Sequence, residues 1–219
     1  MKKPLLIIGN KNYSSWSLRA WLMLKYAKVD FDELRIPLFA PDTNAALLKH
    51  SPSGFVPVYR ESDLIVWDTL AIAEYLYETH PALWPADRNA RATARSVCAE
   101  MHAGFASLRK AMPMNIRATG RRVVSTPELE ADIARIKSIW GELRKQYAAT
   151  GPWLFGKYSI ADAMYAPVAF RFLTYGVKET GAMDDYLLTV SRDPLIQPWI
   201  NDSIQESETV ALSETGLPG

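Results

Sequence analysis

Hydroxyl side chains gather in this chain where the first predicted strand meets the first predicted helix. The segment from Asn12 to Arg19 reads NYSSWSLR and follows a short apolar run at residues 5–8. A serine at such a junction can cap the helix by accepting a hydrogen bond from a free backbone N–H. The same place also suits a bound anion, because the free N–H groups and the dipole of a helix N-terminus favour negative charge. Ser14 and Ser15 are therefore candidates for capping the helix or for donating a hydrogen bond to an anion such as a thiolate.

A second candidate site precedes the third predicted strand, where Val56 is followed by Pro57. A trans proline is tolerated at the entry of an edge strand and would have only a structural role. X-Pro bonds are also the ones that become cis at low cost. A cis turn would expose the backbone N–H and C=O of Val56 to an extended, peptide-like ligand, which would bind as an added strand. Both interpretations stay open on these residues alone.

Asp68 and Thr69 open the helix that follows this strand region. Both residue types are common helix caps, and capping is compatible with binding. A free carboxylate at this helix N-terminus would receive hydrogen bonds from the Thr69 hydroxyl and N–H, while Asp68 would accept from an ammonium group beside it. Together these contacts fit the head group of an amino acid.

Cys98 is the only cysteine of the chain. One thiol cannot form an internal disulfide, a redox pair or a thiolate zinc cluster, so sulfur chemistry here needs a sulfur atom from another molecule. The three histidines do not have the spacing of metal ligands, and we expect no bound metal. They are His50, His80 and His102.

The overall composition excludes several classes of function. The chain has 219 residues, of which 48% are hydrophobic and 22% charged, and its formal net charge is +1. That balance lacks the excess of positive charge that binding to nucleic acid requires. The apolar runs are far shorter than the roughly 20 residues that span a bilayer, and no secretory signal is recognisable. We therefore expect a cytoplasmic protein without nucleic-acid or membrane partners.

The elements that must position these candidates begin with a small α/β unit in the first 80 residues. Short apolar runs alternate with helical segments in the order βαβαββα, which predicts a mixed sheet with helices packed on it. A three-residue turn separates the last two strands and suggests a hairpin. The expected strands are residues 5–8, 31–36, 56–59 and 64–66, and the expected helices are residues 15–27, 44–49 and 69–78.

Two prolines end this pattern and indicate a linker at residues 81–87. Beyond it the sequence predicts an all-helical unit without strands, residues 88–219. Ser159 and Asp162 have the spacing of a capping box for a buried helix of this unit. The polar end of the chain, from Glu206, is expected to be loose. The expected helices are residues 89–111, 127–148 and 160–173.

Four of these features together resemble the cytosolic glutathione S-transferase family over essentially the whole chain. They are Val56-Pro57, Asp68-Thr69, the box from Ser159 to Asp162, and the succession of an α/β unit and a helical unit. Each feature alone is weak, whereas their shared order and spacing are specific. The resemblance implies a thioredoxin-like, glutathione-binding domain at residues 1–80 and an all-helical, substrate-binding domain at residues 88–219. It also implies a cis peptide bond before Pro57.

Within that family, the serine segment is most similar to the zeta class, whose pattern is Ser-Ser-Cys-Ser. Trp16 stands where that pattern has cysteine, which weighs against the zeta-type isomerisation of maleylacetoacetate and against the cysteine-dependent omega and beta classes. Alignment to the zeta class favours Ser14 as the residue that faces the thiol. Theta-like spacing to Arg19 favours Ser15, so the resemblance leaves both serines open.

The resemblance implies a role for each candidate around bound glutathione. The implied contacts are Ser14 or Ser15 at the sulfur, Val56 and Pro57 at the cysteinyl backbone, Asp68 and Thr69 at the γ-glutamyl end, and Lys49 or His50 near the glycine carboxylate. The electrophile is expected between the two domains, near Trp16, Phe105 and Met112. Methionine and aromatic side chains such as the last two also fill protein cores, so that alternative stays open.

The implied activity is that of a glutathione S-transferase in detoxification, a homodimer that activates glutathione as its thiolate for attack on small apolar electrophiles. A free thiol has a pKa of about 8.5 and is only a few per cent ionised at pH 7, so stabilising the thiolate increases the amount of nucleophile. One alternative is a glutathione-dependent isomerase that acts on a dienoic acid such as maleylacetoacetate. Another is a non-catalytic module of the same fold that binds apolar ligands or proteins, although the intact set of glutathione contacts weighs against it.

Overall fold

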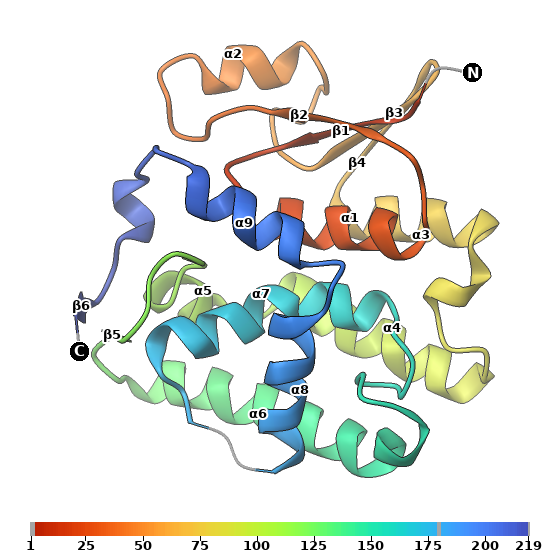
Figure 1. Ribbon diagram of the computed structural model, residues 1–219, viewed down its shortest axis with the longest axis vertical. Helices are drawn as coiled ribbons and strands as arrows, with labels where there is room; N and C mark the ends of the chain where they lie inside the picture. Colours follow the sequence, from red (N-terminus) through yellow and green to blue (C-terminus); the bar gives the residue numbers. More distant parts are fainter. Residues whose placement is uncertain (1–2, 179–180, 219) are drawn as a thin grey trace.

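The computed structural model describes residues 3–178 and 181–218 (Figure 1). Its larger sheet consists of β1 (Leu5–Ile8), β2 (Asp32–Arg35), β3 (Val58–Glu61) and β4 (Leu64–Trp67). The strand order is β2-β1-β3-β4. β1 runs parallel to β2 and antiparallel to β3, and β3 pairs with β4 as the expected hairpin, with Glu61 opposite Leu64.

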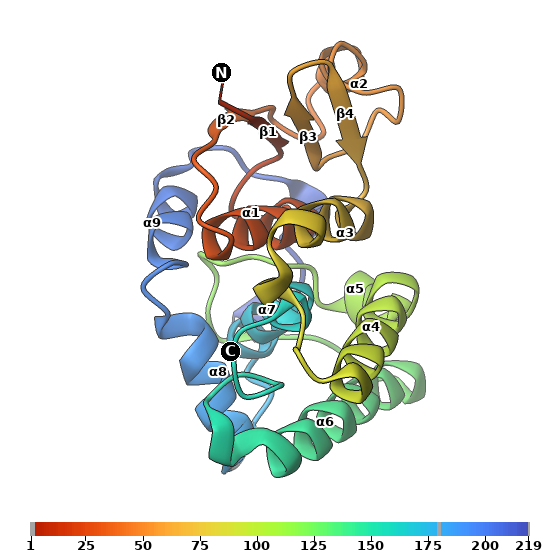
Figure 2. The same ribbon diagram turned by 90° about the vertical axis from the view of Figure 1, so that its right-hand side faces the viewer.

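Helices cover both faces of this sheet. They are α1 (Ser15–Tyr26), α2 (Thr43–Leu48) and α3 (Thr69–Thr79). α1 and α3 lie on one face and α2 on the other (Figure 2). Because successive side chains of a strand point to opposite faces, Leu6 and Ile8 join the core under α1 and α3, whereas Ile7 packs with Leu47 and Val58 on the α2 side. The thioredoxin-like βαβαββα arrangement is thus confirmed.

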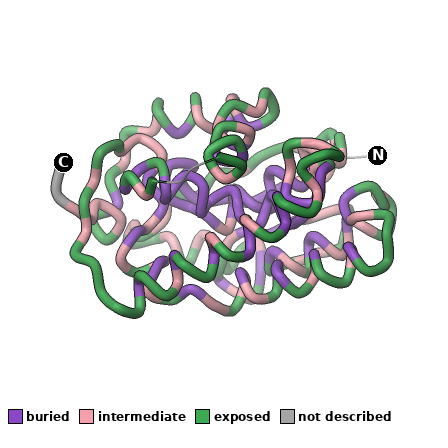
Figure 3. The backbone as a smooth tube through the Cα atoms, turned by 90° about the horizontal axis from the view of Figure 1, so that it is seen from below, coloured by how far each residue is buried: buried purple, intermediate pink, exposed green. Residues whose placement is uncertain are grey.

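The second half of the chain is helical, as predicted. Its helices are α4 (Arg88–Ala103), α5 (Ala106–Ala111), α6 (Pro127–Tyr147), α7 (Ile160–Tyr175), α8 (Ala182–Arg192) and α9 (Gln197–Gln205). α7 is buried along almost its whole length and packs against α1, α4 and α8, so it joins the helical half to the α/β half. In Figure 3 buried residues gather in the interior of the molecule, while exposed residues lie along its outer side. Within the described residues, no helix is long and apolar enough to cross a membrane.

The start of α7 depends on one buried carboxylate. Ser159 and Asp162 form the predicted capping box, and Asp162 Oδ2 accepts a hydrogen bond from the backbone N–H of Ser159 at 2.8 Å. Asp162 Oδ1 accepts another from the N–H of Leu154 at 2.9 Å, which ties the preceding loop to the helix. A single side chain therefore satisfies two buried backbone donors at the centre of the helical half.

Several predicted elements differ from the structure. The expected helix 89–111 is two helices, because Phe105 adopts a left-handed φ of 60° and Gly104 lies so close to the Glu100 carbonyl that a Cβ there would be only 2.8 Å from the oxygen. α8 and α9 were not predicted. The linker contains a short 3-10 helix, Pro81–Leu83. The prediction of a strand-free second half was wrong, since β5 (Arg121–Arg122) pairs with β6 (Leu217–Pro218).

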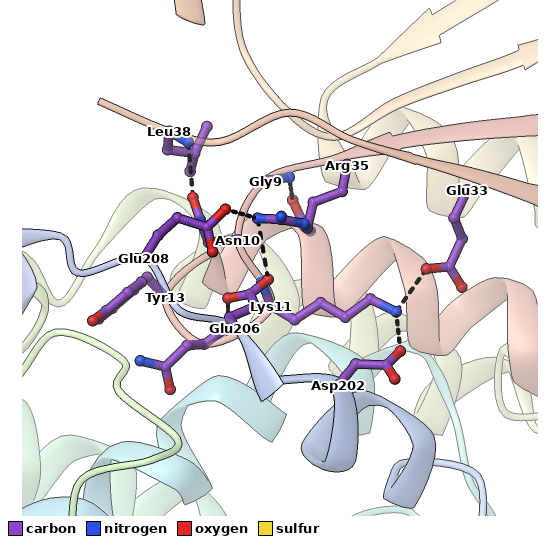
Figure 4. A network of polar contacts seen from close by, with 12 residues as sticks. Gly9, Asn10, Lys11, Tyr13, Glu33, Arg35, Leu38, Asp202, Glu206 and Glu208 are labelled. Carbon is purple, nitrogen blue, oxygen red and sulfur yellow. Dashed lines mark hydrogen bonds and ion pairs between the residues drawn. The ribbon is translucent and has the colours of Figure 1, made fainter. Parts of the chain in front are cut away.

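The prediction of a loose C-terminus was also wrong. The two carboxylate oxygens of Glu206 accept hydrogen bonds from the backbone N–H groups of Lys11 and Asn12, at 2.6 and 3.0 Å (Figure 4). The Lys11 ammonium pairs in turn with Asp202 at 2.6 Å and with Glu33 at 2.7 Å. We call these contacts of the loop after β1, which it makes with β2, with α9 and with the segment after α9, the C-terminal clasp. The clasp fixes the loop that leads directly into Ser14.

Replacement of Glu206 by glutamine is expected to lower the free energy of unfolding by about 2 kcal/mol, because a carboxylate that receives two backbone N–H groups loses its charge and one acceptor. Chemical denaturation measures this loss. Glu208→Gln is the matched control: its carboxylate pairs with Arg35 at 2.8 Å but is about one third exposed, so a change below about 1 kcal/mol is expected. Equal losses in the two variants would contradict a special role for Glu206.

Candidate active site

Two cavities lie beside each other at the junction of the two halves, and they share the residues Trp16, Phe55 and Val56. The larger has a volume of about 490 Å³ and is lined by Ser14 and Ser15 from the start of α1. It also reaches the loop between β2 and α2. The smaller has a volume of about 270 Å³ and lies at the start of α3. Together they form one elongated cleft, which we call the interdomain cleft.

A chain of hydrogen bonds holds the Ser14 side chain in place, and it starts at the backbone of Gly9, the residue that follows β1. The N–H of Gly9 donates to Ser17 Oγ at 3.0 Å, and Ser17 Oγ lies 2.7 Å from Ser14 Oγ. Ser14 is the N-cap of α1, and its oxygen also accepts from the N–H of Ser17. If the Ser17 hydroxyl donates to Ser14, the Ser14 hydroxyl proton points elsewhere and is available to a ligand in the cleft. Capping and ligand binding are therefore compatible for this serine.

Ser15 is placed differently. It is the first residue of α1 and lines the larger cavity, and the residue is buried, as Ser14 is. Its hydroxyl makes no hydrogen bond to any residue within 3–178 or 181–218. Ser15 therefore has a free hydroxyl without a fixed direction, whereas Ser14 has one that its neighbours orient.

The Val56–Pro57 peptide bond is cis, as the resemblance implied. Val56 lies just before β3 and lines both cavities. Neither its N–H nor its C=O forms a backbone hydrogen bond with another described residue. The cleft thus offers one free donor and one free acceptor just before β3, and a peptide that binds as an added strand requires both.

Asp68 and Thr69 line the smaller cavity at the N-terminus of α3. Asp68 Oδ1 caps the helix by accepting from the N–H groups of Leu70 and Ala71, and Asp68 Oδ2 lies 3.3 Å from His102 Nε2. Asp68 has a positive φ of 73°, a conformation that costs free energy in a residue other than glycine and is often kept where function requires it. Thr69 Oγ1 is buried and has no hydrogen-bond partner among the described residues.

Four other predicted residues lie outside this cleft. Lys49 is exposed at the end of α2 and lines neither cavity, and His50 next to it lines neither as well. Phe105 and Met112 are buried in the main hydrophobic core rather than facing either cavity. Trp16 alone among the expected electrophile contacts lines the cleft, and its indole ring packs edge-on against His102 with ring centroids 5.2 Å apart.

The cleft also contains residues that sequence reasoning missed. His102 comes from α4 and meets Asp68 across the two halves, a contact that no local pattern could reveal. Asn44 lines the larger cavity and makes no hydrogen bond within the described part of the chain, so its side-chain amide is free. Ser53 and Ser213 supply further hydroxyl groups, one from before the cis proline and one from the C-terminal segment. Among the described residues there is no group of three His, Cys, Asp or Glu that could hold a metal ion.

Comparison with known proteins gives concordant results for both halves. The family model "Glutathione S-transferase, N-terminal domain" matches residues 13–79, and "Glutathione S-transferase, C-terminal domain" matches residues 126–201. A curated relative, "Probable maleylacetoacetate isomerase" from Caenorhabditis elegans, is 32% identical over 109 residues, which are 49% of this chain and 50% of the relative. The chain thus aligns with about half the length of that relative.

Solved structures share the fold over nearly the whole chain. A glutathione transferase homologue from Burkholderia GL BGR1, with bound glutathione, superposes with a TM-score of 0.70 at 22% identity, covering 93% of this chain and 98% of the other. A theta-class glutathione S-transferase from Xanthomonas axonopodis pv. citri, with glutathione bound, has a TM-score of 0.62 at 22% identity, covering 91% and 98%. The interdomain cleft therefore lies in a two-domain fold that is known from many solved proteins.

Proposed function

The chain belongs to the glutathione S-transferase family, and from this we propose that it joins glutathione, through its sulfur atom, to small electrophiles in the interdomain cleft. One observation carries the proposal: Ser14, Ser15 and the unpaired backbone of Val56 line the same cavity. A hydroxyl donor for a thiolate and a peptide-pairing edge thus lie together. In this proposal residues 1–80 bind glutathione, residues 81–87 are the linker, and residues 88–219 supply the other wall of the substrate site.

Glutathione fits the cleft with its γ-glutamyl end in the smaller cavity. There the Thr69 hydroxyl and backbone N–H would donate to its carboxylate, and the Asp68 carboxylate would accept from its ammonium group. The cysteinyl backbone would pair with the N–H and C=O of Val56 beside Pro57. The sulfur would then lie in the larger cavity, next to the two serines at the start of α1.

The proposed chemistry is stabilisation of the glutathione thiolate. Ser14 would donate a hydrogen bond from its hydroxyl to the sulfur, because Ser17 and the Gly9 N–H orient that hydroxyl. The dipole of α1 adds to the effect, since the sulfur lies at its N-terminus. The thiolate attacks the electrophilic carbon, the new C–S bond forms, and the leaving group departs with its bonding electrons. Ser14 thus acts as a fixed donor and forms no covalent bond.

Asn44, rather than Lys49, is expected to hold the glycine carboxylate, because its free side-chain amide lines the larger cavity while Lys49 faces solvent outside it. Asn44→Ala should raise the Kd for glutathione about 10-fold, the usual effect of losing one hydrogen bond to a charged group. Lys49→Ala is the matched control and should leave the Kd unchanged. Isothermal titration calorimetry measures both constants. The reverse order of effects would assign the carboxylate to Lys49.

The proposal is tested by conjugation of glutathione to 1-chloro-2,4-dinitrobenzene, with the product identified by mass spectrometry. Formation of the thioether faster than the uncatalysed reaction, together with retention of the protein on immobilised glutathione, supports a transferase. Retention without any thiol-dependent reaction would favour the non-catalytic module. The name of the curated relative favours a second candidate, glutathione-dependent isomerisation of a dienoic acid, and a maleylacetoacetate assay separates it from conjugation.

The assembly and cellular location belong to the same proposal. Phe55 and Trp67 are exposed apolar side chains that line the cleft, and their burial against a second copy of the chain would support a homodimer. Size-exclusion chromatography with light scattering measures the assembly directly, and a monomer at micromolar concentration would contradict it. The single cysteine, Cys98, is buried and free, which suits a cytoplasmic protein.

A further inference from the structure

Three arginine side chains from three different helices lie close enough for their charges to act on one another, and two of them lie against Trp16. They are Arg19 on α1, Arg109 in α5 and Arg171 in α7. The guanidinium carbons of Arg19 and Arg109 lie 4.2 and 4.7 Å from the centroid of the Trp16 ring. Arg19 is 0% exposed and Arg171 is 4% exposed. We call these three residues the arginine cluster.

Two members of the arginine cluster have buried donors without acceptors. Arg19 donates through Nε to the Met164 carbonyl at 2.9 Å, but its Nη1 and Nη2 have no partner in the described part of the chain. Arg171 Nε and Nη1 are also buried and unpartnered there. Arg109 differs, because it donates to the carbonyls of Met101, His102 and Gly104. The unmet hydrogen-bonding capacity therefore belongs to Arg19 and Arg171.

Arg19 and Arg171 also lack a counter-ion, whereas the negative charge of Asp132 acts on Arg109. None of the three arginines takes part in a salt bridge between described residues, and the surrounding side chains include no carboxylate that could pair with Arg19 or Arg171. Burial, reinforced by the positive charge of Arg109, lowers the pKa of Arg171 to about 9, and the pKa of Arg19 is lowered for the same reasons. Arg171 nonetheless keeps its proton at neutral pH. A buried, unpaired charge is costly, and such charges in proteins normally meet an anion.

Trp16 connects the arginine cluster to the interdomain cleft. Its half-buried ring lines both cavities, and the guanidinium groups of Arg19 and Arg109 lie against the same ring without lining either cavity themselves. An electrophile in the larger cavity, near the serines, would therefore rest against this indole ring. A turn of the ring would open the buried N–H groups to a ligand in the cleft.

We propose that the arginine cluster binds a carboxylate of the electrophilic substrate, with Arg19 and Arg171 as the donors that receive it. This inference rests on the proposed transferase function and specifies its substrate class: an electrophile with an apolar body and one anionic end. The four unpartnered nitrogens match a carboxylate, which has about four lone-pair positions and pairs well with the planar guanidinium group. Arg109 positions the Trp16 ring and adds positive charge.

A pair of substrates that differ only in charge shows what the reaction would be. 4-Chloro-3,5-dinitrobenzoate carries a carboxylate, and its methyl ester does not. In both, the thiolate attacks the carbon that bears chlorine, a C–S bond forms, the C–Cl bond breaks, and chloride leaves with the bonding electrons. The thiol proton goes to solvent. Only the benzoate can use the arginine cluster.

Binding is measured first, because it does not depend on catalysis. Calorimetry with the unreactive probes 3,5-dinitrobenzoate and 3,5-dinitrobenzamide is expected to show tighter binding of the anion to the unaltered protein. Arg171→Met should weaken binding of the benzoate by about 10- to 100-fold and leave the amide within about twofold. Arg135→Met is the matched control, since Arg135 pairs with Glu100 on the surface, and it should change neither. The melting temperature of Arg171→Met should be unchanged or higher, because the variant loses an unpaired buried charge.

The conjugation rates then distinguish a failure of the carboxylate inference from a failure of the proposed transferase function. Arg171→Met should raise the KM for 4-chloro-3,5-dinitrobenzoate by a similar factor and leave the KM for its methyl ester and the Kd for glutathione unchanged. Equal binding of benzoate and benzamide by the unaltered protein would overturn the inference, even if both chlorides are conjugated. Weaker glutathione binding in Arg171→Met would instead assign the cluster to a carboxylate of glutathione and also overturn it. Failure of the proposed function would appear separately, as absence of conjugation with 1-chloro-2,4-dinitrobenzene.

Discussion

Replacement of Ser14 by alanine is expected to lower kcat/KM for glutathione conjugation about 100-fold at pH 6.5, with little change in the Kd for glutathione. The physical reason is that a fixed hydrogen-bond donor to a developing or bound anion contributes strongly when it is held in place before the ligand arrives. Ser17 and the Gly9 N–H hold the Ser14 hydroxyl in this way. The pKa of the bound thiol should rise towards its value of about 8.5 in water, and ultraviolet absorbance of the thiolate against pH measures that change.

Two further variants test the direction of the hydrogen-bond chain. Ser17→Ala should raise the pKa of the bound thiol by less than Ser14→Ala, because it removes only the group that orients the Ser14 hydroxyl. Ser15→Ala is the matched control, since its hydroxyl is free and without fixed direction among the described residues. A loss of activity in Ser15→Ala with normal activity in Ser14→Ala would reverse the assignment. Normal activity in the double variant would remove both serines from the mechanism.

Replacement of Asp162 by alanine is expected to destabilise the protein by about 3 kcal/mol or more. The variant leaves the backbone N–H groups of Leu154 and Ser159 buried without acceptors, and each unmet donor costs about 1 to 3 kcal/mol. Urea denaturation followed by circular dichroism measures the free energy of unfolding. Asp184→Ala is the matched control, because Asp184 is an exposed acid in the first turn of α8 and should change stability by no more than about 0.5 kcal/mol.

The same carboxylate predicts a dependence of stability on pH. Burial raises the pKa of Asp162 from its usual 3.8 to about 6, despite the N–H groups that favour its charged form. The folded state therefore binds the proton more tightly than the unfolded state. This contribution to stability is complete below pH 3.8 and is lost as the pH rises through 6, by about 3 kcal/mol in all. Asp162→Asn should remove this contribution, so a parallel pH profile in variant and unaltered protein would contradict it.

Local patterns were sufficient to predict the first 80 residues. Every expected strand and helix there is present, with boundaries that differ by at most about two residues. Each element has a short apolar run or a cap within its own segment, and these local features determine where it begins and ends. The helix 89–111 was predicted as continuous because its residues favour a helix throughout, while the break depends on the left-handed conformation of Phe105. α8 and α9 are short, and much of their surface is polar, so their apolar faces become evident only once they pack against the rest of the molecule.

The residues of the candidate site also fall into two groups, those that local sequence patterns reveal and those that only the packed structure reveals. Ser14, Val56 and Asp68 stand at junctions between elements, and such junctions are visible in a linear sequence. His102 and Asn44 could not be found in that way, because their relation to the cleft depends on contacts between distant segments. The arginine cluster was missed for the same reason: its members lie 90 and 62 residues apart along the chain (109 − 19 and 171 − 109) and meet only when α1, α5 and α7 pack together.

The C-terminal clasp has a consequence for how this protein is made in the cell. Glu206 binds the backbone of Lys11 across 195 positions of sequence, so this contact can form only after Glu206 itself has been synthesised. The α/β half can fold while it emerges from the ribosome, since its own contacts are already available. The loop before Ser14 receives these partners only after Asp202 and Glu206 have emerged from the ribosome. A chain whose synthesis stops before Glu206 would thus have most of the fold, but the loop before α1 would lack its hydrogen bonds to Glu206.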